Sequence, residues 1–171
     1  MINEREVFIL IYLDNAATTK AFEEVLDTYL KVNQSMYYNP NSPHKAGLQA
    51  NQLLQQAKAQ INAMINSKTN YDVVFTSGAT ESNNLALKGI AYRKFDTAKE
   101  IITSVLEHPS VLEVVRYLEA HEGFKVKYVD VKKDGSINLE HFKELMSDKV
   151  GLVTCMYVNN VTGQFHKWLK L

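Results

Sequence analysis

The segment FTSGATESNNLALKG, residues Phe75–Gly89, reads as the end of a strand, a turn of small residues and a helix. The β-rich run Asp72–Thr76 leads into it, and residues 77–79 carry almost no side chain that could block a close approach. From Thr80 onward, apolar residues recur at spacings of three and four, which predicts a helix. We therefore expect a strand–turn–helix unit here.

Such a turn points the free N–H groups of the first helical turn at whatever lies beyond the strand, which suits a phosphate. An ordinary strand-to-helix connection explains the same pattern, because Gly-rich turns of this kind are common. Gly78 stands alone, so the segment matches neither the dinucleotide fingerprint G-x-G-x-x-G nor the P-loop. On shape alone, both interpretations stay open.

The amino-acid sequence of the segment resembles the phosphate-binding motif of the cysteine desulfurases. These are pyridoxal-phosphate (PLP) enzymes of the class V aminotransferase group. Further blocks are similar to the same family and occur in its order, namely YLDNAATT (Tyr12–Thr19), YNPNSPHKAG (Tyr38–Gly47), EHPSV (Glu107–Val111) and YVNNVTGQ (Tyr157–Gln164). Together the blocks span most of the chain. Their combination is far more specific than any single block.

Composition indicates an ordinary globular protein. The 171 residues suit about one domain, and Lys plus Arg (19) balance Asp plus Glu (19), so no net charge favours nucleic acid or an acidic membrane surface. The apolar run Val7–Leu13 is too short to span a bilayer. The single cysteine fits a reducing compartment, and we expect a cytoplasmic protein.

Alternating apolar strands and amphipathic helices predict an α/β fold with a parallel sheet covered on both faces. We expect helices at about residues 22–34, 46–66, 80–94, 110–121 and 139–147, and strands at residues 72–76, 100–105, 125–131 and 150–158. The resemblance implies the aspartate-aminotransferase-like (fold type I) large domain. The expected domains are a leader and extended segment (1–20), a partial PLP-binding large domain (21–164) and a divergent tail (165–171).

The resemblance implies roles for residues near the predicted strand ends, where ligands of open α/β sheets bind. Ala79 and Thr80 match the positions that hold the cofactor phosphate. His108 matches the catalytic histidine that stacks on the pyridine ring and helps to move protons. Asn160 matches the residue that binds the phenolic oxygen of PLP. Without the family, His108 reads as a surface polar residue and Asn160 as part of a turn.

We expect the other polar residues near these positions to stabilise helix ends and loops. We expect no metal site. Glu81 and Asn83 are expected to cap the helix from Thr80, and Asn159 to brace its loop. A Ser110-x-x-Glu113 capping box is expected to start the following helix.

Cys155 is expected to be a buried small residue and not the nucleophile, because it lies inside an apolar run. In the family, the Schiff-base lysine, the pyridinium-binding carboxylate, the substrate-binding arginine and the nucleophilic cysteine all follow the Asn-Asn block. The His-Lys pair at residues 166–167 follows Gly163 too closely to be the family's pair.

The resemblance stops after Gln164. In one possible set of codons, a single nucleotide restored there turns the tail into a helix start like the family's, so we hypothesise a frameshift. The chain is then an N-terminal fragment, inactive alone.

The expected parent activity is PLP-dependent conversion of L-cysteine to L-alanine, with the sulfur carried as an enzyme persulfide for iron–sulfur clusters or thio-cofactors. The family also implies a homodimer and a sulfur-acceptor or scaffold protein as partner. A selenocysteine lyase, another class V lyase or transaminase, and a non-catalytic remnant are the alternatives.

Overall fold

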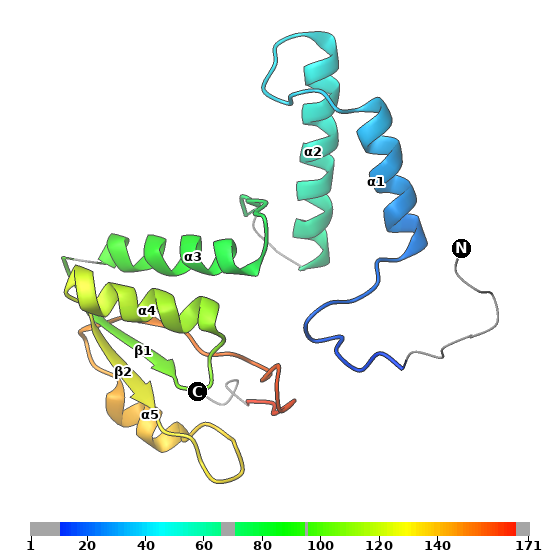
Figure 1. Cartoon of the computed structure of the whole chain (residues 1–171). Helices are drawn as coiled ribbons and strands as arrows, with labels where there is room; N and C mark the ends of the chain where they lie inside the picture. Colours follow the sequence, from blue (N-terminus) through cyan, green and yellow to red (C-terminus); the bar gives the residue numbers. More distant parts are fainter. Residues whose placement is uncertain (1–10, 66–70, 95, 167–171) are drawn as a thin grey trace. The chain divides into compact units, whose positions relative to one another are not determined.

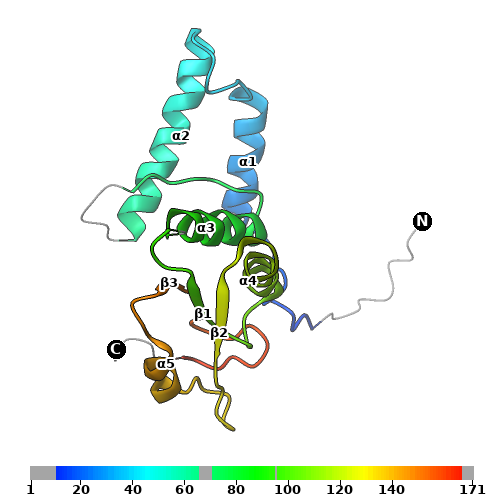
Figure 2. The same cartoon turned by 90° about the vertical axis from the view of Figure 1, so that its left-hand side faces the viewer.

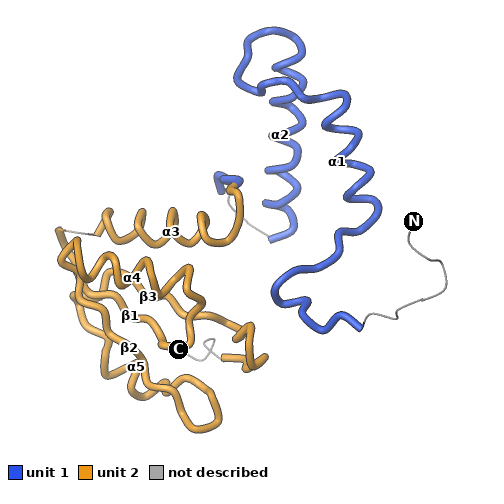
Figure 3. Tube along the Cα trace, viewed as in Figure 1, with its two compact units in different colours: residues 1–75 blue, residues 76–171 orange. Residues whose placement is uncertain are grey.

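The computed structural model describes residues 11–65, 71–94 and 96–166. The chain divides into two compact units, residues 1–75 and 76–171 (Figure 3). The predicted leader and most of the predicted tail lie outside the described residues, as does the predicted end of the second helix at Asn66. Among the described residues, no helix is long and apolar enough to cross a membrane.

The first unit contains helices α1 (Glu23–Ser35) and α2 (Lys45–Met64), close to the predicted ranges (Figure 1). Helix α2 begins at His44, whose ring Nδ1 accepts a hydrogen bond from the Gly47 N–H at 3.2 Å. Helix α1 buries none of its residues in this unit. Its apolar residues Val25, Leu26, Tyr29 and Leu30 are exposed.

The predicted strand at Asp72–Thr76 is wrong. Residues 72–76 form neither a helix nor a strand, and they belong to no sheet. Side chains of α2 hold its start instead, because the Asn62 amide donates to the Tyr71 carbonyl at 2.8 Å and Lys58 pairs with Asp72 at 3.0 Å. A strand needs a neighbouring strand for its peptide groups, and β propensity alone does not supply one.

The second unit is a three-stranded parallel sheet with helices on both faces (Figure 2). Its elements are α3 (Ala79–Lys94), β1 (Glu100–Ser104), α4 (Pro109–Glu122), β2 (Lys125–Val129), α5 (Leu139–Leu145) and β3 (Val150–Val153). The strand order is β2-β1-β3, and β1 pairs in parallel with both neighbours. The predicted α/β class with a parallel sheet is confirmed.

Consecutive residues of β1 divide the core into two parts, since side chains alternate across a strand. Ile101 packs with apolar residues of α3 and α4, while Ile102 packs with Val129, Ile137 and Phe142 on the α5 side. Both isoleucines are fully buried. The central strand is therefore sealed on both faces.

Strand β3 ends at Val153, earlier than the predicted Val158. The Thr154 N–H still donates to the Ile102 carbonyl at 2.9 Å, but residues 154–156 belong to no strand. Val158 instead forms an isolated antiparallel bridge with Phe165. The Asn-Asn block consequently lies on a loop that folds back on itself.

Gly151 is a position where the packing of β3 against α3 can be tested. A Cβ built there would lie 2.5 Å from the Ala98 carbonyl oxygen and 3.2 Å from the Lys94 Cβ. We expect Gly151→Ala to lower the free energy of unfolding by about 1–3 kcal/mol through overpacking. Thermal or urea unfolding of the purified chain measures this change.

Gly89 provides the matched control, because nothing lies within 4 Å of a Cβ built at this helical position. Gly89→Ala should raise stability by about 0.5–1 kcal/mol through helix propensity. Equal effects of the two substitutions would contradict the close packing at Gly151.

Candidate functional site

The turn before α3 is fixed by hydrogen bonds within residues 76–82. The Ser77 N–H and hydroxyl donate to a Glu81 carboxylate oxygen at 2.7 and 2.8 Å, and the Thr76 and Ser82 hydroxyls lie 2.6 Å apart. The backbone bond is the main reason that the pKa of Glu81 lies below its ordinary value. The predicted capping role of Glu81 is confirmed.

The start of α3 leaves room for a ligand. Ala79 and Thr80 are exposed, and no atom lies within 4 Å of a Cβ built at Gly78. The first intrahelical bond runs from the Ser82 N–H to the Gly78 carbonyl, so the preceding N–H groups have no acceptor within the helix. The free N–H groups and the positive end of the α3 helix dipole therefore lie together at a surface formed by small residues.

His108 caps α4. Its Nδ1 accepts a hydrogen bond from the Ser110 N–H at 3.1 Å and lies 2.8 Å from the Ser110 hydroxyl oxygen. The predicted Ser110–Glu113 capping box is wrong, because Pro109 occupies the first helical turn and moves the cap to His108. Glu113 pairs with Arg116 at 2.6 Å instead.

Asn83 connects α3 to the start of α4. Its side-chain amide donates to the Ser110 hydroxyl at 2.8 Å. The predicted capping role of Asn83 is wrong, because at this position on α3 its side chain reaches the neighbouring helix and not the backbone of its own first turn. Sequence reasoning missed this contact, which joins residues 27 positions apart.

Thr80 and His108 line the same pocket, a space of about 390 Å³ along α3 and α4. Its wall also includes Lys88, whose ammonium lies 4.7 Å from the centre of the Tyr117 ring. The structure thus brings two of the predicted site residues together. Asn160 is not among the residues that line this pocket.

The two neighbouring asparagines of the loop after β3 differ in burial and in hydrogen bonding. Asn159 is buried, and its Oδ1 accepts hydrogen bonds from the N–H groups of Val161 and Thr162 at 2.9 Å. Its amide donates to the Leu106 carbonyl at 3.4 Å. This confirms Asn159 as the brace of the loop, while Asn160 is exposed and offers its side chain to solvent.

Glu107 joins this loop to the one that carries His108. Its Oε1 accepts from the Met156 N–H at 2.5 Å and from the Ser104 hydroxyl at 3.2 Å. The residue is buried, and burial raises the pKa of its carboxyl despite these two donors. Sequence reasoning did not single out Glu107, and its place shortly after the predicted strand at residues 100–105 is the signal that could have found it.

Cys155 is half-buried beside this carboxylate. Burial raises the pKa of the Cys155 thiol to about 12, and the Glu107 charge adds to the rise. At neutral pH the group is a thiol and a poor nucleophile. The interpretation of Cys155 as a structural residue fits its surroundings, although it is less buried than predicted.

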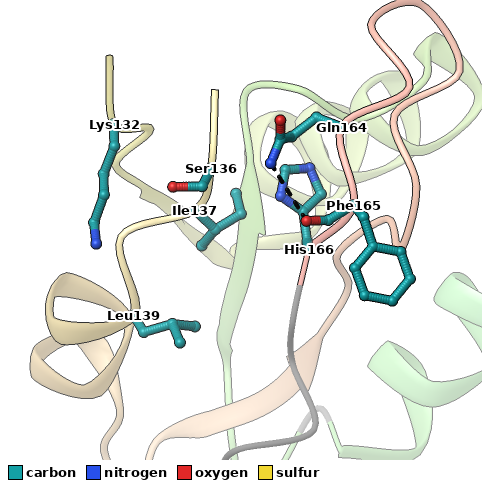
Figure 4. A pocket seen from close by; sticks show the side chains of 7 residues that line it. All are labelled: Lys132, Ser136, Ile137, Leu139, Gln164, Phe165 and His166. Carbon is teal, nitrogen blue, oxygen red and sulfur yellow. Dashed lines mark hydrogen bonds between the residues drawn. The ribbon is translucent and has the colours of Figure 1, made fainter. Parts of the chain in front are cut away.

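A second pocket, of about 300 Å³, lies beside the loop that ends at His166 (Figure 4). It is lined by Lys132, Ser136, Ile137, Leu139, Gln164, Phe165 and His166. The His166 side chain is buried, and among the described residues neither ring nitrogen has a hydrogen-bond partner. No pattern in the sequence pointed to this pocket. The other member of the His-Lys pair, residue 167, lies outside the described residues.

The described residues contain no group of three or more His, Cys, Asp or Glu side chains placed to hold a metal ion.

The family model for aminotransferase class V matches residues 11–171. The chain belongs to this family. It is 42% identical over 154 residues to a NifS/IcsS protein homolog of Lactobacillus delbrueckii, covering 90% of this chain and 40% of the relative. It is 40% identical over 161 residues to the cysteine desulfurase IscS of Ehrlichia chaffeensis, covering 94% of this chain and 38% of the relative.

Solved structures of related proteins have the same fold. A NifS-like protein superimposes with a TM-score of 0.86 at 36% identity, covering 91% of this chain and 42% of the other. SspA in complex with cysteine gives a TM-score of 0.82 at 33% identity, covering 91% and 44%. The class V chain therefore spans about two fifths of the length of its relatives.

Glu107 allows a test of the buried carboxylate that joins the two loops. Because its pKa in the fold is raised, protonated Glu107 favours folding, and this stabilisation is lost as pH rises above the ordinary carboxyl range. Glu107→Gln keeps Oε1 as an acceptor without a charge. We expect the variant to gain thermal stability over the unaltered chain between about pH 5 and about pH 8.

The measurement is the difference in melting temperature between Glu107→Gln and the unaltered chain across that range. Glu113→Gln, at an exposed position, is the control and should show no such trend. A difference that stays constant with pH would contradict a raised pKa at Glu107.

Proposed function

We propose that the chain is part of a PLP-dependent cysteine desulfurase, which converts L-cysteine to L-alanine and passes the sulfur on as an enzyme persulfide. The observation that carries the proposal is that Thr80 and His108, from separate family blocks, line one pocket. The names of the relatives support it, as does the neighbour solved with cysteine. Residues 21–164 then form part of the large domain.

The residues present fit a phosphorylated cofactor. The N–H groups of Ala79 and Thr80 and the Thr80 hydroxyl would hold the phosphate at the start of α3, where small residues leave space. The His108 ring would stack on the pyridine ring, and Asn160 would donate to its phenolic oxygen. When bound, the cofactor would supply the electron sink that makes the Cα proton of the substrate acidic.

In this proposal the described residues bind and orient the cofactor, and none of them forms a covalent bond with the cofactor or the substrate. The sulfur-carrying thiolate has to come from a residue other than Cys155, whose pKa of about 12 keeps it protonated. We therefore expect the 171-residue chain alone to release no alanine from L-cysteine beyond that released by free PLP.

The complete enzyme is proposed to be a cytoplasmic homodimer that hands sulfur to an acceptor or scaffold protein. Support for a further interface comes from α1, which buries none of its residues within its own unit. The sulfur would serve iron–sulfur clusters or thio-cofactors.

Thr80→Ala tests the phosphate site in the chain itself. We expect the substitution to weaken PLP binding about tenfold or more, because a hydrogen bond to a charged group is lost. The dissociation constant is measured from the shift in melting temperature with PLP concentration. Thr97→Ala is the control, since Thr97 is exposed, follows the far end of α3 and donates its hydroxyl to the Lys94 carbonyl at 3.3 Å. Equal loss in both variants would place the phosphate elsewhere.

A chimera tests the activity. Residues 11–164 replace the matching segment of the Ehrlichia chaffeensis enzyme, and alanine release from L-cysteine is measured. We expect turnover, and a loss of about a hundredfold or more in His108→Ala. His121→Ala, on the same helix but outside the pocket, should keep the activity. A folded chimera that binds PLP but releases no alanine from L-cysteine would count against the proposal.

A further inference from the structure

The contacts of His108 determine which of its ring nitrogens carries the proton. Nδ1 lies 3.1 Å from the backbone nitrogen of Ser110, and a backbone N–H can only donate. Nδ1 must therefore present a lone pair to it. In a neutral imidazole with an accepting Nδ1, the proton sits on Nε2.

The Ser110 hydroxyl reinforces the same arrangement. Its oxygen lies 2.8 Å from Nδ1 and 2.8 Å from the Asn83 amide nitrogen, which also can only donate. The Ser110 oxygen accepts a hydrogen bond from the Asn83 amide, so the Ser110 O–H is available to donate to Nδ1. The hydrogen bonds run in one direction, from Asn83 through Ser110 to His108. Ser110 is 8% exposed, so water competes little for its hydroxyl.

We propose that Ser110, oriented by Asn83, is a positioning residue that holds the neutral His108 ring in its Nε2–H tautomer. The inference deepens the proposed function, on which the use of the ring rests. Nε2 then presents a proton and no lone pair to the pocket that His108 lines with Thr80. In this tautomer the neutral ring can stabilise negative charge beside it by donating a hydrogen bond from Nε2.

His44 is an internal comparison for this network. It caps α2 in the same way, with Nδ1 accepting from the Gly47 N–H at 3.2 Å. Among the described residues it has no hydroxyl and amide relay like that of His108. Its tautomer is set by the backbone contact alone, so substitutions at Ser110 or Asn83 should leave it unchanged.

The experiment is NMR on the full chain labelled with ¹⁵N-histidine, using long-range ¹H–¹⁵N correlations at a pH where the rings are neutral. The His108 signals are identified by their absence in His108→Gln. We expect the Nε2–H form to dominate. Ser110→Ala should raise the ratio of the Nδ1–H to the Nε2–H form about two- to tenfold, which corresponds to one neutral hydrogen bond. Ser110→Thr, which keeps the hydroxyl, should give the same tautomer ratio as the unaltered chain.

Asn83→Asp tests the direction of the relay without removing Ser110. A carboxylate can only accept, so the Ser110 hydroxyl would donate its hydrogen bond to the introduced carboxylate and its oxygen could accept from Nδ1–H. We expect this variant to shift His108 toward the Nδ1–H form at least as far as Ser110→Ala, with His44 unchanged. It also keeps the test open if Ser110→Ala does not fold.

A dominant Nδ1–H form in the unaltered chain would overturn the proposal. A His108 tautomer ratio that stays the same in the folded Ser110 or Asn83 variants would also overturn it. These measurements need neither PLP nor turnover. Failure of the chimera assay would therefore count against the proposed function, while failure of the NMR test would count against the relay.

Discussion

The second unit depends on the complete burial of β1. Residues Ile101–Ser104 of this strand have no exposed surface, so no water can satisfy their peptide groups. Strand β2 pairs in parallel with the whole of β1, and β3 pairs in parallel with its first residues, up to Ile102. The apolar side chains need cover on both faces as well, which α3, α4 and α5 provide.

A strand held this tightly also fixes the position of the residues directly after it. The chain leaves β1 at Ser104 and reaches His108 within a few residues, so the position of the histidine is set by the sheet and not by a long loop. The Ser104 hydroxyl donates to Glu107, whose carboxylate also receives the Met156 N–H from the loop after β3. A buried carboxylate is costly, and these donors offset part of the cost. These hydrogen bonds tie together the two loops that carry His108 and Asn160.

Much of this arrangement could be predicted from local patterns. Helical spacing places the helices to within a few residues, and alternation of apolar strands with helices predicts the parallel sheet. The proposed sites of ligand binding came from family blocks at expected strand ends. These features depend on neighbours close in the chain or on the general geometry of α/β sheets.

The errors share a physical cause, which is competition from contacts that a local pattern does not contain. Asp72–Thr76 has strand propensity, but Asp72 and the preceding Tyr71 are held by side chains of α2. Ser110 has the right spacing for a capping box, yet Pro109 suits the first helical turn and leaves the cap to His108. Freed from capping, the Ser110 hydroxyl becomes available to Asn83 from another helix.

The changed role of Ser110 affects how the site is assembled. The turn before α3, the Asn83 contact and the His108 cap involve residues of one compact unit, and their hydrogen bonds close within it. The free N–H groups at the start of α3 and the imidazole of His108 are therefore positioned by contacts within this unit. Preorganised donors lose little entropy when a ligand arrives. In the proposed function, binding and orientation of the ligand are therefore separable from the reaction that it undergoes, and this chain supplies residues for binding and orientation.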